Sequence, residues 1–167
     1  MTPQEQIDAV VAQLQFVLGL PAGRCFQGSV PEQGVPGEID TLLIVYYGGS
    51  TPSEEWALGG AALNRPYILG VYGQFFLSVD APDRLIEASQ RQLALIESIG
   101  GALHLFGEGS ALFPDGGLVY THDEVATSTG SDGQCRHEVR VSFRAVALNA
   151  WHTVQGIPEP GTPGSDA

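Results

Sequence analysis

The first twenty residues have the hydrophobic spacing of an amphipathic helix. In "TPQEQIDAVVAQLQFVLGLP", Thr2 and Glu5 form a T-x-x-E capping pattern, and Pro3 stands at the first helical position. Apolar residues then recur at i, i+3, i+4, i+7, i+10 and i+11, so they share one face. They are Ile7, Val10, Val11, Leu14, Val17 and Leu18. We predict a helix over residues 2–18, ended by Gly19 and Pro21.

Two later segments have the composition of strands. Residues 42–47, "LLIVYY", form a continuous apolar run of strand length. Residues 66–80, "PYILGVYGQFFLSVD", carry apolar side chains at both odd and even positions. A strand with two apolar faces is buried on both sides, so we expect it to be central. Helices would cover one face, and a second surface, such as a neighbouring subunit, would cover the other. The Pro- and Gly-rich residues 22–37 leave room for at most a short strand.

A second amphipathic helix follows the long strand. Asp80 is the expected N-cap, Pro82 falls in the first turn, and Gly100 is expected to end the helix. The predicted apolar stripe consists of Leu85, Ala88, Leu95, Ile96 and Ile99. A short strand is expected at residues 103–106, and a turn-rich loop follows it.

The last third of the chain predicts a strand hairpin. Residues 118–125 are expected to form an exposed strand, and "STGSDGQ" has hairpin-turn composition. In "HEVRVSFRAVAL", residues 137–148, apolar residues alternate with Arg140, Ser142 and Arg144, which indicates one buried and one solvated face. The fold class is therefore α+β, a mainly antiparallel sheet with the N-terminal helix and a second amphipathic helix packed on it. We expect one domain over residues 1–154, long loops, and an extended Pro/Gly-rich tail over residues 155–167.

Composition narrows the possible classes of protein. The chain has 167 residues, of which 43% are hydrophobic and 16% charged, as is typical of a globular domain. No apolar run reaches 18 residues, and "MTPQEQ" lacks the basic start of a secretory signal, so we expect a cytoplasmic origin and no membrane association. Seven arginines, no lysine and 19 carboxylates give a net charge of −12, which argues against tight binding to nucleic acid.

A loop at Gly48, Gly49, Ser50 and Thr51 is a candidate for anion binding, because it follows a strand. It has neither the lysine of a P-loop nor the G-x-G-x-x-G fingerprint, so a plain turn is the simpler interpretation. An anion-binding α/β module remains an alternative hypothesis.

Other candidate chemistry lies near the end of the chain. His122, Asp123, Cys135 and His137 could in principle ligate a metal, but their spacing matches no standard zinc pattern. Ser110 in "EGSAL" lacks the second glycine of a nucleophile elbow. We expect no catalytic, cofactor-binding or metal-binding residue, with a small metal-dependent hydrolase as an alternative. Cys25 and Cys135 form no CxxC pair and are expected to be buried.

Five residues are candidates for a subunit or partner interface. Arg140 and Arg144 fall on one face of their strand, and this short cationic row would suit an acidic partner unless local carboxylates balance it. Trp56, Tyr120 and Trp151 lie in loops or at element ends, where aromatic side chains either anchor interfaces or cover the edges of their own core.

The order of these elements resembles that of the tail terminator proteins of long-tailed bacteriophages. The resemblance covers about residues 2–150 and consists of pattern and order: a helix, a strand ending in "VYYGG", the strand "YILGVYGQFFLSVDAP", the helix "DRLIEASQRQLALIESIGG" and the late strand "RHEVRVSFRAVAL". It includes no catalytic or ligand motif. The long loops at residues 48–66 and 107–135 and the C-terminal tail depart from the shorter members of that family.

The resemblance implies a non-enzymatic structural virion protein. Its subunits would form a ring, usually of six, that caps the tail tube beneath the head–tail connector and passes DNA through its lumen. Its partners would be other copies of itself, the tail tube protein and the neck or connector protein. It would act in the virion at the head–tail junction, after assembly in the host cytoplasm. Another neck or tail-completion protein is the alternative within the same class.

Overall fold

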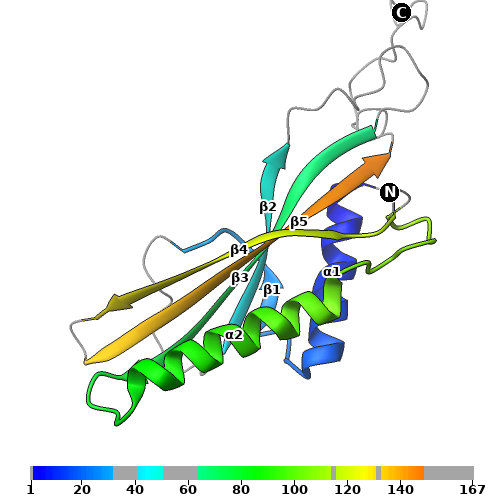
Figure 1. The fold of residues 1–167 in the computed structure, drawn as a ribbon. Helices are drawn as coiled ribbons and strands as arrows, with labels where there is room; N and C mark the ends of the chain where they lie inside the picture. Colours follow the sequence, from blue (N-terminus) through cyan, green and yellow to red (C-terminus); the bar gives the residue numbers. More distant parts are fainter. Residues whose placement is uncertain (1, 32–40, 51–63, 114–115, 131–132, 149–167) are drawn as a thin grey trace, which may run out of the picture.

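The structure is a computed structural model that describes residues 2–31, 41–50, 64–113, 116–130 and 133–148 (Figure 1). Within these residues, two helices and five strands follow one another. They are α1 (Pro3–Leu18), β1 (Cys25–Gln27), β2 (Leu42–Ser50), β3 (Asn64–Ser78), α2 (Arg84–Leu103), β4 (Val119–Thr129) and β5 (Gln134–Leu148). Trp56, Trp151 and the predicted tail lie outside the described residues.

The five strands form one sheet in the order β1-β2-β3-β5-β4, so β3 is central, as predicted. β1 runs parallel to β2, and the other three pairs of neighbouring strands are antiparallel. β3 and β5 pair without interruption from Asn64 opposite Leu148 to Ser78 opposite Gln134. α1 lies against β1 and β2, while α2 lies against β3, β5 and β4. The predicted α+β class is confirmed.

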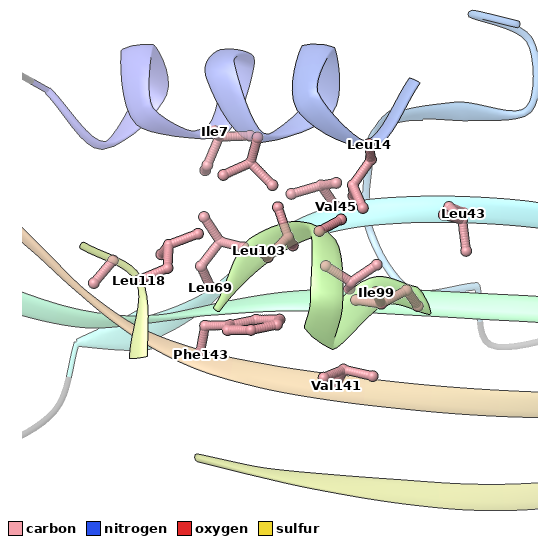
Figure 2. Packing of buried hydrophobic residues seen from close by; sticks show 14 of the residues in the cluster. Ile7, Leu14, Leu43, Val45, Leu69, Ile99, Leu103, Leu118, Val141 and Phe143 are labelled. Atoms are coloured by element: carbon pink, nitrogen blue, oxygen red, sulfur yellow. The ribbon is translucent and has the colours of Figure 1, made fainter. Parts of the chain in front are cut away.

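The main core lies between the two helices and one face of the sheet (Figure 2). α1 contributes Ile7, Val10 and Leu14, and the C-terminal end of α2 contributes Ile99 and Leu103. Each of these five side chains is at most 2% exposed. The strands contribute alternate residues of one face: Leu43, Val45, Leu69, Val71, Val139, Val141, Phe143, Ala145 and Ala147. The alternation of apolar residues predicted for β5 therefore faces this core.

The cap of α1 forms as its sequence predicts. The Thr2 hydroxyl accepts a hydrogen bond from the backbone N–H of Glu5, and the Glu5 carboxylate accepts one from the backbone N–H of Thr2. These reciprocal bonds satisfy two N–H groups that the first turn of a helix leaves unpaired. Gly19 ends the helix in the left-handed conformation, at φ 64°.

The predicted turn at Gly48 and Gly49 is wrong, because β2 continues through both glycines to Ser50. The pairing with β3 shifts between Tyr47 and Ser50, which is the signature of a β-bulge. Gly49 has a φ of 96°, and a Cβ on Gly48 would lie 2.8 Å from Cγ2 of Ile68. The bulge therefore requires both glycines, one for its backbone angle and one for the close approach of β3.

The predicted bounds of the second helix are also wrong. α2 begins after Asp83, which has a φ of 55° and makes no side-chain capping bond, and not after Asp80. It continues past Gly100 to Leu103, and turns replace the strand expected at residues 103–106. Ile99, Ala102 and Leu103 are buried against the core, and this packing outweighs the roughly 1 kcal/mol that a helical glycine costs relative to alanine.

Gln6 is the one fully buried amide of α1, and it joins three elements. Its Nε2 donates to the carbonyl oxygens of Leu112 at 2.7 Å and Val146 at 2.8 Å. Its Oε1 accepts a 2.7 Å hydrogen bond from the buried hydroxyl of Tyr67. Burial raises the pKa of Tyr67, so the phenol stays a donor. These hydrogen bonds attach α1 to the sheet, and they involve both the nitrogen and the oxygen of the Gln6 amide.

We expect Gln6→Leu to lower the free energy of unfolding by about 1–3 kcal/mol, because it leaves the Tyr67 hydroxyl and two carbonyls buried without this partner. Urea unfolding followed by circular dichroism measures the loss. Gln4→Leu is the matched control, since Gln4 is exposed on the same helix and its amide bonds to the exposed side chains of Asp8 and Gln27. It should shift stability by less than about 0.5 kcal/mol. Equal midpoints for the two variants would contradict the proposed network.

Candidate interaction surfaces

Large exposed apolar side chains gather on the two flanks of the described structure. On the α2 and β4 side they are Leu85, Ile86, Leu93, Tyr120 and Val125, which we call the α2–β4 surface. On the α1 and β2 side they are Phe16 and Val17 at the C-terminal end of α1, and Tyr47 beside Tyr67 near the N-terminal part of that helix, which together we call the α1–β2 surface. One more, Leu105, lies in the turn after α2. Because β1 and β4 are the opposite ends of the strand order, the two surfaces lie at opposite edges of the sheet.

Two of these exposed residues correct the predicted helix faces. Leu85 is 75% exposed and Val17 is 48% exposed, although both fall on the predicted buried stripes of their helices. Leu85 lies in the first turn of α2 and Val17 in the last turn of α1. Apolar residues that lie off the buried stripe of a helix indicate an exposed apolar surface. Phe16, Ile86 and Leu93 are such residues, and they were not among the predicted interface residues. Phe16 is 86% exposed.

β4 forms the outer edge of the α2–β4 surface. Its residues are exposed from Tyr120 to Thr129, and only Val119 is half-buried. The exposed strand predicted at residues 118–125 is therefore confirmed, and it runs four residues further than expected. The amide of Gln92 on α2 donates to the carbonyl oxygens of Ala126 at 3.3 Å and Glu138 at 3.2 Å, which holds the helix across the hairpin.

A shallow groove of about 520 Å³ lies between the C-terminal half of α2 and the start of β4. Its lining comprises Ile96, Glu97, Gly100, Gly101, His104, Tyr120 and Asp123. A Cβ on Gly100 or Gly101 would meet nothing within 4 Å, so packing within the described chain does not require these glycines. They leave the helix backbone open to close approach from outside.

Tyr120 stands at the rim of this groove and is 39% exposed. Its ring packs edge-on against Phe143 at a centroid distance of 6.3 Å, and its hydroxyl donates to the carboxylate of Asp123. That hydrogen bond raises the pKa of the Tyr120 phenol. The side chain therefore covers the edge of its own core and also presents an exposed ring, and its role in an interface remains a prediction.

Arg140 and Arg144 lie on the sheet face opposite the helices, as the strand alternation predicts. Their partners on β3 are Tyr72 and Ile68. Both arginines are half-buried, so the face predicted to be solvated is partly covered. On the same face, Arg136 forms a 2.9 Å ion pair with Glu138. Glu138 thus balances Arg136 next to the row, and Glu124 on β4 is the cross-strand neighbour of Arg140. The use of Arg140 and Arg144 as an interface remains a prediction.

Tyr46 and Tyr72 also lie on that face. A Cβ on Gly70 would lie 2.1 Å from Cζ of Tyr46, so the Tyr46 ring crosses the sheet directly over Gly70. The Tyr72 hydroxyl donates a 2.8 Å hydrogen bond to the Glu138 carboxylate. Burial, and to a smaller extent this hydrogen bond, raises the pKa of Tyr72. Leu42, Ile44 and Tyr72 form a second buried apolar cluster, and Phe26, Val30 and Tyr46 pack against it.

The four residues considered as metal ligands are not brought together. His122 and Asp123 are exposed on β4, whereas Cys135 and His137 are buried on β5. Within the described residues there is no group of three or more His, Cys, Asp or Glu side chains that could hold a metal ion. Burial raises the pKa of the Cys25 thiol to about 11, as expected of a cysteine that serves as a small apolar residue.

His137 has a packing role. Its ring stacks on Phe75 at 5.3 Å, and its Nδ1 lies 3.0 Å from the hydroxyl of Thr127. Arg91 lies over the other ring of this pair, with its guanidinium carbon 4.3 Å from the centroid of Phe75. Burial, together with the charges of Arg84 and Arg91, lowers the pKa of His137. The imidazole is therefore neutral at pH 7 and packs between Phe75 of β3 and Thr127 of β4.

No protein-family model matches the chain, and no curated protein matches it. A chain of the solved structure titled "Virion of native gene transfer agent (GTA) particle" aligns with 87% of this chain and 96% of its own length, at 13% identity and a TM-score of 0.40. This likeness is too loose to establish a shared fold or function. Among the described helices, neither is long and apolar enough to cross a bilayer.

We expect the free energy of unfolding to fall as the pH drops below about 6.5, the ordinary pKa of histidine. In that range the unfolded chain binds a proton at His137, while the folded chain, with its lowered pKa, binds it only at more acidic pH. Urea titrations at pH 7.5 and 5.5 measure the change. His137→Phe, which keeps an aromatic ring beside Phe75, should show a smaller difference between the two values. If His137→Phe has the same pH dependence as the wild type, His137 is not the group that lowers the stability at acidic pH.

Proposed function

We propose that this protein is a non-enzymatic structural subunit of a phage-type virion, and specifically a tail terminator. In this proposal the subunits form a ring, usually of six, that stops growth of the tail tube and joins it to the neck or connector. DNA passes through the lumen without specific binding. The domain over residues 1–154 builds the ring, and residues 155–167 form an extended tail.

One observation carries the proposal: the exposed apolar side chains lie on two different surfaces at opposite edges of one sheet. When the two contact surfaces of a subunit differ, head-to-tail association repeats, and it closes into a ring if the rotation between subunits allows. A self-complementary dimer needs only one such surface. The order of helices and strands resembles that of tail terminators. This resemblance agrees with ring formation and is the reason for proposing a tail terminator in particular.

The charge distribution also supports a lumen that does not retain DNA. All seven arginines fall in the described residues, together with ten of the 19 carboxylates, so this part of the chain has a net charge of 7 − 10 = −3. The other nine carboxylates fall in the remaining residues, which contain no arginine. A protein with this balance repels phosphate on average, and DNA can slide past it.

The alternatives have less support. The hydrolase hypothesis needs a cluster that His122, Asp123, Cys135 and His137 do not form. The anion-binding hypothesis needs an open loop after β2, whereas Gly48 and Gly49 belong to the strand itself. Another neck or tail-completion protein remains the alternative within the same class, because it would also form a ring.

Native mass measurement and negative-stain imaging test the proposal. We expect closed rings of about six subunits, either from the purified chain or on addition of tail tube protein. A chain that stays monomeric with tube and connector proteins present would contradict the proposal. A ring that binds the connector and does not stop tube growth would favour the alternative neck protein.

Substitutions on the two surfaces should weaken ring formation independently. We expect Leu93→Glu and Phe16→Glu each to reduce the fraction of subunits in rings by about tenfold or more, because each buries a carboxylate in an apolar contact. Ala111→Glu is the charge-matched control, since Ala111 is exposed and belongs to neither surface. Rings at wild-type yield in both surface variants would show that these residues lie outside the contacts.

A further inference from the structure

The outer edge of β4 exposes backbone hydrogen-bonding groups. The backbone N–H of Gly130 donates to the carbonyl of Gln134, so these two residues form a hydrogen-bonded pair. In an antiparallel ladder, bonded and unbonded pairs alternate. The register of β4 and β5 therefore directs the N–H and C=O groups of Asp123, Val125 and Thr127 away from β5. Among the described residues no strand lies beyond β4.

This edge has little protection against pairing with another chain. The sequence of β4, "VYTHDEVATST", has neither proline nor lysine, the residues that commonly protect an edge strand. Its protection is limited to the bulge between Tyr120 and His122 and to a few charges. An edge of this kind can accept a further strand through main-chain hydrogen bonds.

Side chains beside the edge point toward the helices and are still exposed. Asp123 and Val125 stand opposite Val141 and Val139, which belong to the main core, so all four side chains lie on the helix side of the sheet. Val125 is nevertheless 57% exposed. A strand added to β4 would place every second side chain on this same side, next to Val125 and Asp123.

The groove between α2 and β4 receives side chains at this position, because Asp123 belongs to its lining. Ile96 supplies an apolar wall from α2, and Gly100 and Gly101 leave the helix backbone open. A segment that pairs with β4 beside Asp123 therefore has room for one of its side chains between the strand and the helix.

The groove is acidic. Glu97 and Asp123 are carboxylates, and no arginine is among the described residues that line it. Asp123 accepts a hydrogen bond from the hydroxyl of Tyr120, which is uncharged. His104 also lines the groove, and its Nδ1 accepts a hydrogen bond from the backbone N–H of Tyr120 at 3.4 Å, so this ring nitrogen holds no proton. Such a groove favours a cation from outside its own walls.

The nearby arginines are directed to other groups. On α2, Arg84 donates to a backbone carbonyl that precedes the helix, and Arg91 pairs with Glu87. On β5, Arg140 is the cross-strand neighbour of Glu124 and lies on the sheet face away from the helices. These arginines are therefore engaged on the helix itself or on the opposite face.

The rest of this chain does not offer a cationic segment either. Every arginine lies in a described helix or strand or, as Arg24 does, directly before one, and the chain has no lysine. Backbone hydrogen bonds to Pro21 and Leu43 hold Arg24 in place. The residues outside the described ranges contain nine carboxylates and neither arginine nor lysine. A complementary segment therefore comes from another protein, and not from this chain or a second copy of it.

We propose that the outer edge of β4 and the adjoining groove are the docking site for an extended segment of another protein, one that carries an arginine or lysine two residues from an apolar side chain. The segment forms main-chain hydrogen bonds with Asp123, Val125 and Thr127. Its cation faces Asp123 and Glu97, and its apolar side chain covers Val125. The contact goes beyond the proposed function and does not depend on ring formation, which is tested through Leu93.

A pair of peptides tests the contact. The probe is acetyl-Thr-Arg-Thr-Val-Thr-Val-Thr-amide, which puts the arginine and both valines on one face of a strand, and its partner has glutamine in place of arginine. In a nuclear magnetic resonance titration of the full chain, the amides of Gly100, Val125 and Thr127 should shift. The arginine peptide should bind at least about threefold more tightly. No shift with millimolar arginine peptide, or equal affinity for both peptides, would overturn the proposal.

Neutral variants of the groove separate charge from packing. The chain carrying Glu97→Gln and Asp123→Asn should bind both peptides equally, because the two carboxylates are lost while their shapes are kept. The matched control carries Asp8→Asn and Glu87→Gln, which removes two exposed carboxylates outside the groove and should keep the preference for arginine. Circular dichroism establishes that each variant is folded. A preference that persists in the groove variant would overturn the assignment of Glu97 and Asp123.

Hydrogen exchange of the wild type is an independent test of the strand edge. Without peptide, the amides of Val125 and Thr127 should exchange at least about tenfold faster than that of Ala126, which pairs with β5. The arginine peptide should slow both. Protection of Val125 and Thr127 in the free chain would show that the edge is already covered and would overturn the proposal. A failure of the peptide tests leaves ring formation standing, and a chain without rings leaves this contact standing.

Discussion

The continuous pairing of β3 with β5 is the interaction on which the rest of the structure depends. Fifteen residue pairs join the two strands without a bulge, so the alternation of side chains stays in phase along both. A shift of one residue would turn the core residues Val139, Val141 and Phe143 away from the helices. Because the register is fixed over this length, one face of the sheet can receive both helices.

The same pairing gives the molecule its two different edges. On one side, β2 and β1 are added to β3, and α1 closes the β1 edge through Gln15. On the other side, β5 pairs with β4, whose outer backbone groups have no described partner. A sheet with one partly closed edge and one open edge is asymmetric. Such a subunit is suited to head-to-tail association, which is the type of contact that a closed ring of identical subunits uses.

Much of the fold could be predicted from the sequence, and the failures have physical causes. The capping pattern at Thr2 and the alternation in β5 are local signals, and both were confirmed. The turn predicted at Gly48 and Gly49 was wrong, because a bulge and a turn need the same residue type and only the pairing with Ile68 distinguishes them. Gly100 failed as a helix end because buried neighbours hold the helix together beyond it.

The interaction surfaces were harder to predict than the core. Periodicity identifies the side of a helix that faces its own core, so it assigned Leu85 and Val17 to buried positions, whereas both side chains are exposed in the terminal turns of their helices. Tyr120 was selected for its position near an element end, and the structure places it on the rim of a groove. The buried amide of Gln6 has no local signature, since its three partners come from distant parts of the chain.

Thiol cross-linking tests the central claim most directly, because the native Cys25 and Cys135 are both buried. The chain carrying both Phe16→Cys and Leu93→Cys should give a ladder of covalent oligomers that stops at the size of the ring. Each single variant should form rings that contain no covalent oligomers, because a head-to-tail contact does not bring two copies of the same position together. Efficient covalent dimerisation of the Leu93→Cys variant alone would show that the α2–β4 surface pairs with itself and would contradict the account.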